Sequence, residues 1–65
     1  MSQQSLVQLL GPYKGNEIVV LGNTINRRID PTHYVVIYTA NDHIEAINIM
    51  HQWRRETNEI SKSNN

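Results

Sequence analysis

The feature that most constrains this chain is a helical pattern over residues 41–58 whose apolar side is unusually wide. Six polar side chains share one arc, and the apolar ones lie on the remaining roughly 200°, with Arg54 among them, whereas an ordinary surface helix carries an apolar stripe of about 100°. The six are Glu45, Asn48, Gln52, Arg55, Glu56 and Glu59. The apolar arc comprises Ile44, Ala46, Ile47, Ile49, Met50 and Trp53. One small sheet cannot cover such an arc, so we expect either a further element or a partner to cover the rest.

Charged residues mark the two ends of this helix. Asp42 with Glu45 three residues later resembles a capping box in which Asp replaces Ser or Thr. Thr39 and Asn41 are alternative caps. Arg54 and Arg55 come later, as the helix dipole favours.

Two apolar, β-branched segments before the helix predict strands. They are the stretch "NEIVVLGN" at 16–23 and the stretch "HYVVIYT" at 33–39. Strict alternation in the second would place Tyr34, Val36 and Tyr38 on one face, with Val35 and Ile37 on the other. Both faces are apolar, so we expect the sheet to be covered on both sides, at least at its centre. Residues 24–32 permit a ragged edge strand that ends at Asp30–Pro31.

The N-terminal segment has two interpretations. Leu6, Leu9 and Leu10 have helical spacing, and Gly11 followed by Pro12 is typical of a helix end. A short strand over 6–10 fits equally well. The next stretch, "GPYKGNEIVVLG", resembles the KOW element of ribosomal and transcription-elongation proteins over about a dozen residues. It lacks the small glycine which that element has in the following strand, so we interpret it as an ordinary turn.

These patterns predict an α+β fold. We expect a small antiparallel sheet of two or three strands, one long C-terminal helix packed on it, and a possible short N-terminal helix. The length of 65 residues allows a single domain, which we place at 1–60, followed by a disordered polar tail at 61–65.

Composition limits how so small a domain is stabilised and where it works. The absence of cysteine excludes disulfides and thiolate zinc sites, which leaves self-association as the usual remaining source of stability. No apolar segment is long enough to cross a membrane, and the N-terminus lacks the basic region of a secretion signal. We therefore expect a cytoplasmic protein with no membrane contact.

Few residues suggest chemistry. His33, His43 and His51 lack the spacing of helical metal pairs. The serines, at 2, 5, 61 and 63, lie in terminal segments, and no phosphate-binding glycine motif occurs. We therefore expect no catalytic site, no metal and no cofactor.

The excess of apolar surface favours a non-enzymatic protein-interaction module, such as an adaptor, an inhibitor or an accessory subunit. We expect it to self-associate as a homodimer through the helix edge and a sheet face, beside any partner whose identity the sequence does not give. The expected interface residues are Ile49, Trp53, Arg54, Tyr34 and Tyr38. The alternative is that the N-terminal segment covers the second sheet face and leaves nothing exposed.

A second hypothesis is a small RNA- or DNA-binding protein with a basic-aromatic surface. Its contact residues would be Lys14, Arg27, Arg28, Arg54 and Arg55. The six basic and six acidic residues balance, whereas nucleic-acid binders normally carry a basic excess. Charge therefore favours the protein-interaction hypothesis.

Overall fold

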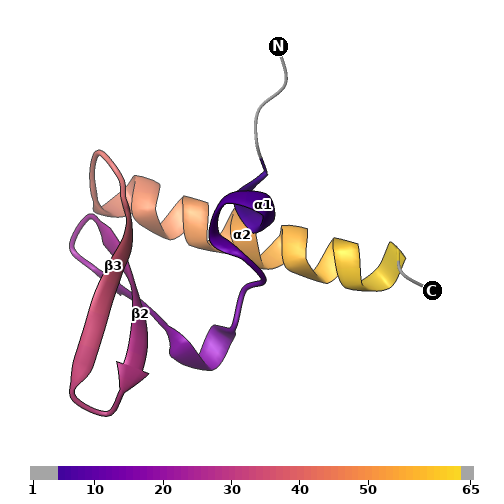
Figure 1. Ribbon diagram of the computed structural model, residues 1–65. Coiled ribbons are helices and arrows are strands. Elements are labelled where there is room, and N and C mark those ends of the chain that lie inside the picture. Colours follow the sequence, from indigo (N-terminus) through magenta and orange to yellow (C-terminus); the bar gives the residue numbers. More distant parts are fainter. Residues whose placement is uncertain (1–4, 64–65) are drawn as a thin grey trace.

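A computed structural model describes residues 5–63 of the chain, with side chains described as far as residue 60. The predicted α+β fold is confirmed: a three-stranded antiparallel sheet is joined by a long C-terminal helix and a short N-terminal one (Figure 1). The elements in chain order are helix α1 (Leu6–Leu10), the 3-10 turn η1 (Gly15–Glu17), strands β1 (Ile18–Leu21), β2 (Thr24–Asp30) and β3 (His33–Thr39), and helix α2 (His43–Ser63).

The sheet is a meander in the order β1-β2-β3, so β2 lies in the middle. The prediction that this segment forms an edge strand is wrong. Its neighbours in sequence are joined to it by two-residue connections, and such short connections force consecutive strands to pair. Gly22 has φ 61° in the first connection, a left-handed conformation that glycine adopts without strain. The edge strands are therefore β1 and β3.

A bulge at Ile37 breaks the alternation predicted for β3. Asn26 pairs with Val36 while Ile25 pairs with Tyr38, which leaves Ile37 as the extra residue. After Ile37 each side chain of β3 therefore points to the face opposite to the one that strict alternation predicts. Tyr38 lies on the same face as Val35, not on the face of Tyr34 and Val36 as strict alternation would require.

Helix α2 covers only one face of the sheet, here called the inner face, and packs on β1 and β2. The core on this face consists of Ile18, Ile25, Ala40, Ala46 and Trp53. Ile44, a member of the wide apolar arc, is 71% exposed. The opposite, outer face stays open toward its edges at Leu21, Tyr34 and Val36, so the expected coverage of both faces holds there only at the centre, where Asn26 is 4% exposed.

The start of α2 agrees with the predicted cap. The Asp42 carboxylate accepts a hydrogen bond from the Glu45 N–H at 2.8 Å, and the Glu45 carboxylate accepts from the Asn41 N–H at 2.6 Å. The backbone of α2 continues to Ser63, beyond the expected end at 58. The side chains at 61–63 and residues 64–65 lie outside the described part, so the disordered tail at 61–65 stays a prediction.

Helix α1 packs against α2 and not against the outer face of the sheet (Figure 1). Ser5 caps it by accepting from the Gln8 N–H at 3.1 Å. The Glu56 carboxylate of α2 accepts from the N–H groups of Leu6 at 2.8 Å and Val7 at 3.3 Å. The helical interpretation of this segment is thus the right one, and the segment covers part of the wide apolar arc.

Candidate interaction surface

Strand β3 is paired on one side only among the described residues, and both of its faces are open. Tyr34 and Val36 on the outer face are 44% and 53% exposed, and Val35 on the inner face is 47% exposed. The inner face is open there because α2 lies over β1 and β2 and does not extend across β3. We call these three consecutive residues the β3 surface.

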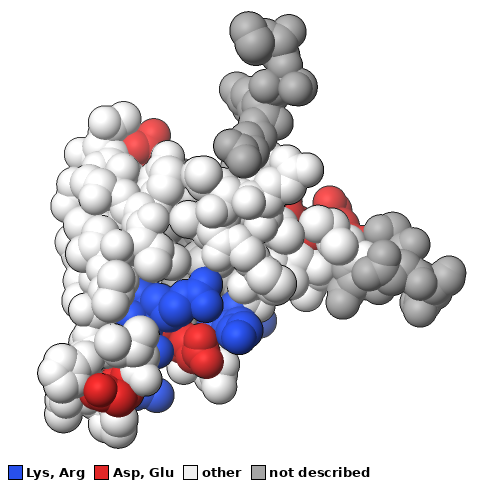
Figure 2. Space-filling model, in the orientation of Figure 1, with Lys and Arg blue, Asp and Glu red and all other residues white. Residues whose placement is uncertain are grey.

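The β3 surface carries no charge. His33–Thr39 contains no Lys, Arg, Asp or Glu. In Figure 2 the left side of the molecule, where β3 lies, is white along most of its length. Edge strands in soluble proteins are commonly protected from pairing by charged side chains, and this strand lacks that protection.

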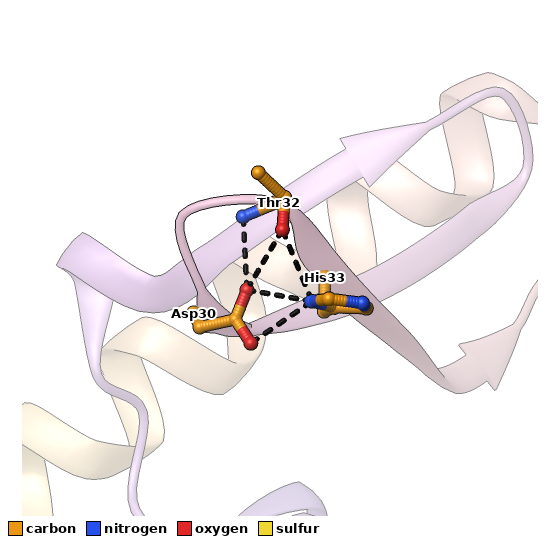
Figure 3. Close-up of polar contacts among 3 residues, drawn as sticks. All are labelled: Asp30, Thr32 and His33. Atoms are coloured by element: carbon orange, nitrogen blue, oxygen red, sulfur yellow. Dashed lines mark hydrogen bonds and ion pairs between the residues drawn. The ribbon is translucent and has the colours of Figure 1, made fainter.

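A polar cluster fixes the turn that leads into β3 (Figure 3). The Asp30 carboxylate accepts from the Thr32 N–H at 2.9 Å, and its two oxygens lie 2.8 and 2.9 Å from Nδ1 of His33. A carboxylate only accepts, so Nδ1 carries the proton in this arrangement. The contact with His33 lowers the pKa of Asp30 below its ordinary 3.8, and the Thr32 N–H lowers it further.

This cluster resembles a Ser-His-Asp arrangement in composition only. The Thr32 hydroxyl lies 3.1 Å from the same Nδ1 atom that contacts Asp30. In a catalytic triad the hydroxyl and the carboxylate bind opposite nitrogens of the imidazole, so that the ring passes a proton between them. All three side chains are also exposed. The geometry is that of a turn clamp and supplies no general base.

Trp53 lies in the core, contrary to the expectation that it stays uncovered. It is 0% exposed, its Nε1–H donates to the Gly11 carbonyl at 2.9 Å, and Tyr13 packs edge-on with ring centroids 4.9 Å apart. Ile49 is half-buried and also packs against the core. The α1 segment therefore covers the part of α2 that we expected to be left for a partner.

The remaining predicted interface residues divide between core and surface. Tyr38 is half-buried and packs against the core, whereas Tyr34 is exposed. Arg54 is exposed on α2. The sequence prediction therefore placed only Tyr34 on the β3 surface and missed Val35 and Val36. The signal for them was present, since this strand is apolar on both faces.

The basic residues do not form one free patch. The Arg27 guanidinium is half-buried, pairs with Glu17 and donates to the Leu10 carbonyl at 3.3 Å. Figure 2 shows Lys and Arg side chains with Asp and Glu side chains directly beside them. The other proposed nucleic-acid contacts, Lys14, Arg28, Arg54 and Arg55, are exposed.

One open hollow of about 300 Å³ lies beside the β2–β3 turn. It is lined by Asn16, Glu17, Arg28, Ile29, Asp30 and Pro31. Both of its carboxylates already have internal partners, in Arg27 and His33. Among residues 5–63 no group of three or more His, Cys, Asp or Glu side chains is placed to hold a metal ion.

The chain matches no protein-family model, no curated protein and no solved structure at a significant level. Within the described part of the chain, no helix has the length and apolar character needed to span a membrane. The function therefore has to be inferred from the surface of the chain.

Proposed function

We propose that this chain is a non-enzymatic protein-interaction module that docks through the β3 surface. The observation that carries the proposal is the exposure of Tyr34, Val35 and Val36 along an edge strand, on both faces of the sheet. An edge strand offers unpaired backbone groups to an incoming strand, and the open side chains offer apolar contact on either side of it.

Energetics support this choice. A large apolar side chain left in water forgoes about 1.5–3 kcal/mol relative to full burial. A 65-residue domain has only a small net stability, so three such residues side by side are a substantial cost. Contiguous exposed apolar residues of this kind typically mark a contact site. Leu21 is also exposed on the outer face, but it lies on β1, with β2 between it and the β3 surface.

The proposal changes the helix part of the interface predicted from the sequence. Trp53 and Ile49 pack in or against the core, and Arg54 is exposed on α2 and not on β3. The roles of adaptor, inhibitor or accessory subunit, and a cytoplasmic location, stay predictions.

The test compares two substitutions of exposed apolar residues by lysine. Val36→Lys changes the β3 surface, and Ile44→Lys is the matched control, since Ile44 is 71% exposed on α2. We expect wild type and Ile44→Lys to bind the same purified partner, or to self-associate, with Val36→Lys at least tenfold weaker. Circular dichroism verifies that both variants fold. Equal binding by all three proteins would overturn the proposal.

Nucleic-acid binding is the less supported alternative. Arg27, one of its five candidate residues, is occupied by Glu17 and the Leu10 carbonyl, and the balanced charge gives no general attraction to phosphate. A titration with single-stranded RNA and duplex DNA at low salt tests it. Binding that weakens steeply with salt, and weakens further in Arg28→Ala with Arg55→Ala, would favour this alternative over docking through β3.

A further inference from the structure

We propose that the occupant of the β3 surface is a second copy of this chain, paired strand to strand. The two β3 strands run antiparallel about a two-fold axis at Val35, so that two three-stranded sheets join into one of six strands. This inference deepens the proposed function and depends on it.

The bulge limits the part of β3 that a new strand can pair with regularly. Tyr34, Val35 and Val36 pair regularly with β2, with a register shift between Arg28 and Asp30 before them and the extra residue Ile37 after them. The three exposed apolar residues all lie in this regular part. Beyond the bulge the side chains of Ile37 and Tyr38 pack against the core. Pairing is therefore expected to centre within 33–36 and not on the middle of the whole strand.

The faces of the side chains select the register. Residues opposite each other in an antiparallel pair share a face of the sheet. An axis at Val35 places Tyr34 opposite Val36 of the second copy, both on the outer face, and Val35 opposite Val35 of the second copy on the inner face. An axis at Val36 would place Tyr34 opposite Tyr38, which the bulge has moved to the other face. The geometry thus favours the axis at Val35.

The chemistry of these pairs suits self-pairing. A two-fold axis brings each residue near the axis close to its own copy, so any charge there would meet a like charge. The strand carries no Lys, Arg, Asp or Glu. The resulting pairs are aromatic with β-branched and β-branched with β-branched, which stabilise antiparallel sheets. The other edge strand, β1, is only four residues long and fits this role less well.

A dimer interface of standard size would bury only a modest fraction of the surface of this chain. A standard interface buries about 800 Å² per partner, about one sixth of the 4833 Å² that the chain exposes. The pairing buries apolar side chains on both faces of β3 as well as its backbone edge. Interfaces of this size have dissociation constants from micromolar to picomolar, so a dimer is expected to be populated at micromolar chain concentrations and above.

Single-cysteine variants test the register directly, since the chain has no cysteine of its own. Opposed residues of an antiparallel pair have Cα atoms about 4.5–5.5 Å apart, within the span of a disulfide. Under mild oxidation we expect Val35→Cys to form a covalent dimer. Val36→Cys alone should stay monomeric, because its nearest copy is displaced along the strand, and should cross-link when mixed with Tyr34→Cys. Leu9→Cys, exposed on α1, is the control and should not cross-link.

Charge exchange at Val35 gives an independent test in solution. Val35→Lys and Val35→Glu should each sediment as monomers, because each places two like charges together at the axis. A mixture of the two should restore the dimer, whereas a foreign partner would bind one variant or the other and gain nothing from mixing. Circular dichroism of each variant verifies the fold, and Ile44→Lys, which should dimerise as wild type does, controls for added charge.

The outcomes separate this inference from the proposed function. A wild-type chain that stays monomeric at hundreds of micromolar overturns self-pairing, and so does a dimer that Leu9→Cys cross-links and Val35→Cys does not. If such a monomer still binds a purified partner through Val36, the docking function stands and its occupant is a strand of another protein. If neither self-association nor partner binding depends on Val36, both proposals fail.

Discussion

At the scale of single residues, Trp53 joins three parts of the chain. Its ring packs edge-on with Tyr13, and its Nε1–H donates to Gly11, while its backbone carbonyl accepts from the Thr57 hydroxyl at 3.1 Å. The Thr57 hydroxyl in turn accepts from the Tyr13 N–H at 2.9 Å. The segment after α1 is thus held to α2 by polar bonds as well as by packing.

Replacing Trp53 should therefore weaken the fold more than it changes any surface. Trp53→Phe keeps an aromatic ring but leaves the Gly11 carbonyl without its donor. We expect the free energy of unfolding to fall by about 1–3 kcal/mol. Urea titration followed by circular dichroism measures it, since the substitution removes the chain's one tryptophan. Arg54→Ala at the neighbouring exposed position should change stability by less than about 0.5 kcal/mol, and an equal loss in both variants would contradict this assignment.

Asp30 makes the stability of the folded state depend on pH. Its pKa is lowered in the folded chain by His33 first and by the Thr32 N–H second, so the ionised carboxylate stabilises the folded state. That stability is complete above the ordinary pKa of 3.8 and is lost as the pH falls through the lower, folded value. We expect wild type to be more stable than Asp30→Asn at pH 6, with the difference shrinking below about pH 4. Thermal unfolding across this range measures it, and a constant difference would contradict the expectation.

At the scale of elements, α1 depends on α2 for its existence. A helix of five residues is too short to be stable in isolation. Glu56 supplies what α1 lacks, because its Oε1 atom accepts from the N–H groups of Leu6 and Val7 at the helix start. The apolar side of α1, at Leu6, Val7 and Leu10, then packs against the core.

Removing the Glu56 carboxylate should release α1 while leaving the sheet intact. We expect Glu56→Ala to lose about 1.5–3 kcal/mol of stability, the range for hydrogen bonds to charged groups. Hydrogen exchange should rise at 6–11 and stay unchanged in β2. Glu59→Ala, exposed on the same helix, is the matched control and should show neither effect. Equal exchange at 6–11 in wild type and Glu56→Ala would show that packing alone holds the helix.

The elements also show which parts of the fold the sequence could predict. Local patterns sufficed for the strands at 18–21 and 33–39 and for the start of α2, because β-branched runs and a capping carboxylate act within a few residues. The position of β2 in the sheet, the bulge at Ile37 and the burial of Trp53 depend on contacts between distant segments. Trp53 was placed at the predicted interface for the same reason: helical periodicity gives the width of an apolar arc but not which segment covers it.

At the scale of the whole molecule, helix α2 is much longer than the strands on which it packs. Helix α2 has 21 residues, so it is about 32 Å long, while the strands it packs on have four and seven residues. The helix packs mainly on β1 and β2 and receives α1 along its next turns, and only the end of β3, at Ile37 and Tyr38, packs against the core. The described chain therefore has one well-covered layer contact and one strand whose first half, at 34–36, stays open.

Such a molecule should gain stability from its own concentration. On the proposed pairing through Val35, only the folded chain dimerises, so a tenfold rise in protein concentration adds up to about 1.4 kcal/mol per mole of dimer. We expect the thermal midpoint of wild type to rise steadily from micromolar to hundreds of micromolar chain. Val35→Lys should show one midpoint throughout, equal to that of wild type at high dilution, because the charge removes pairing and leaves the core untouched. A wild-type midpoint that does not change with concentration would mean that β3 stays unpaired in solution and that the fold is stable with this strand open on both faces.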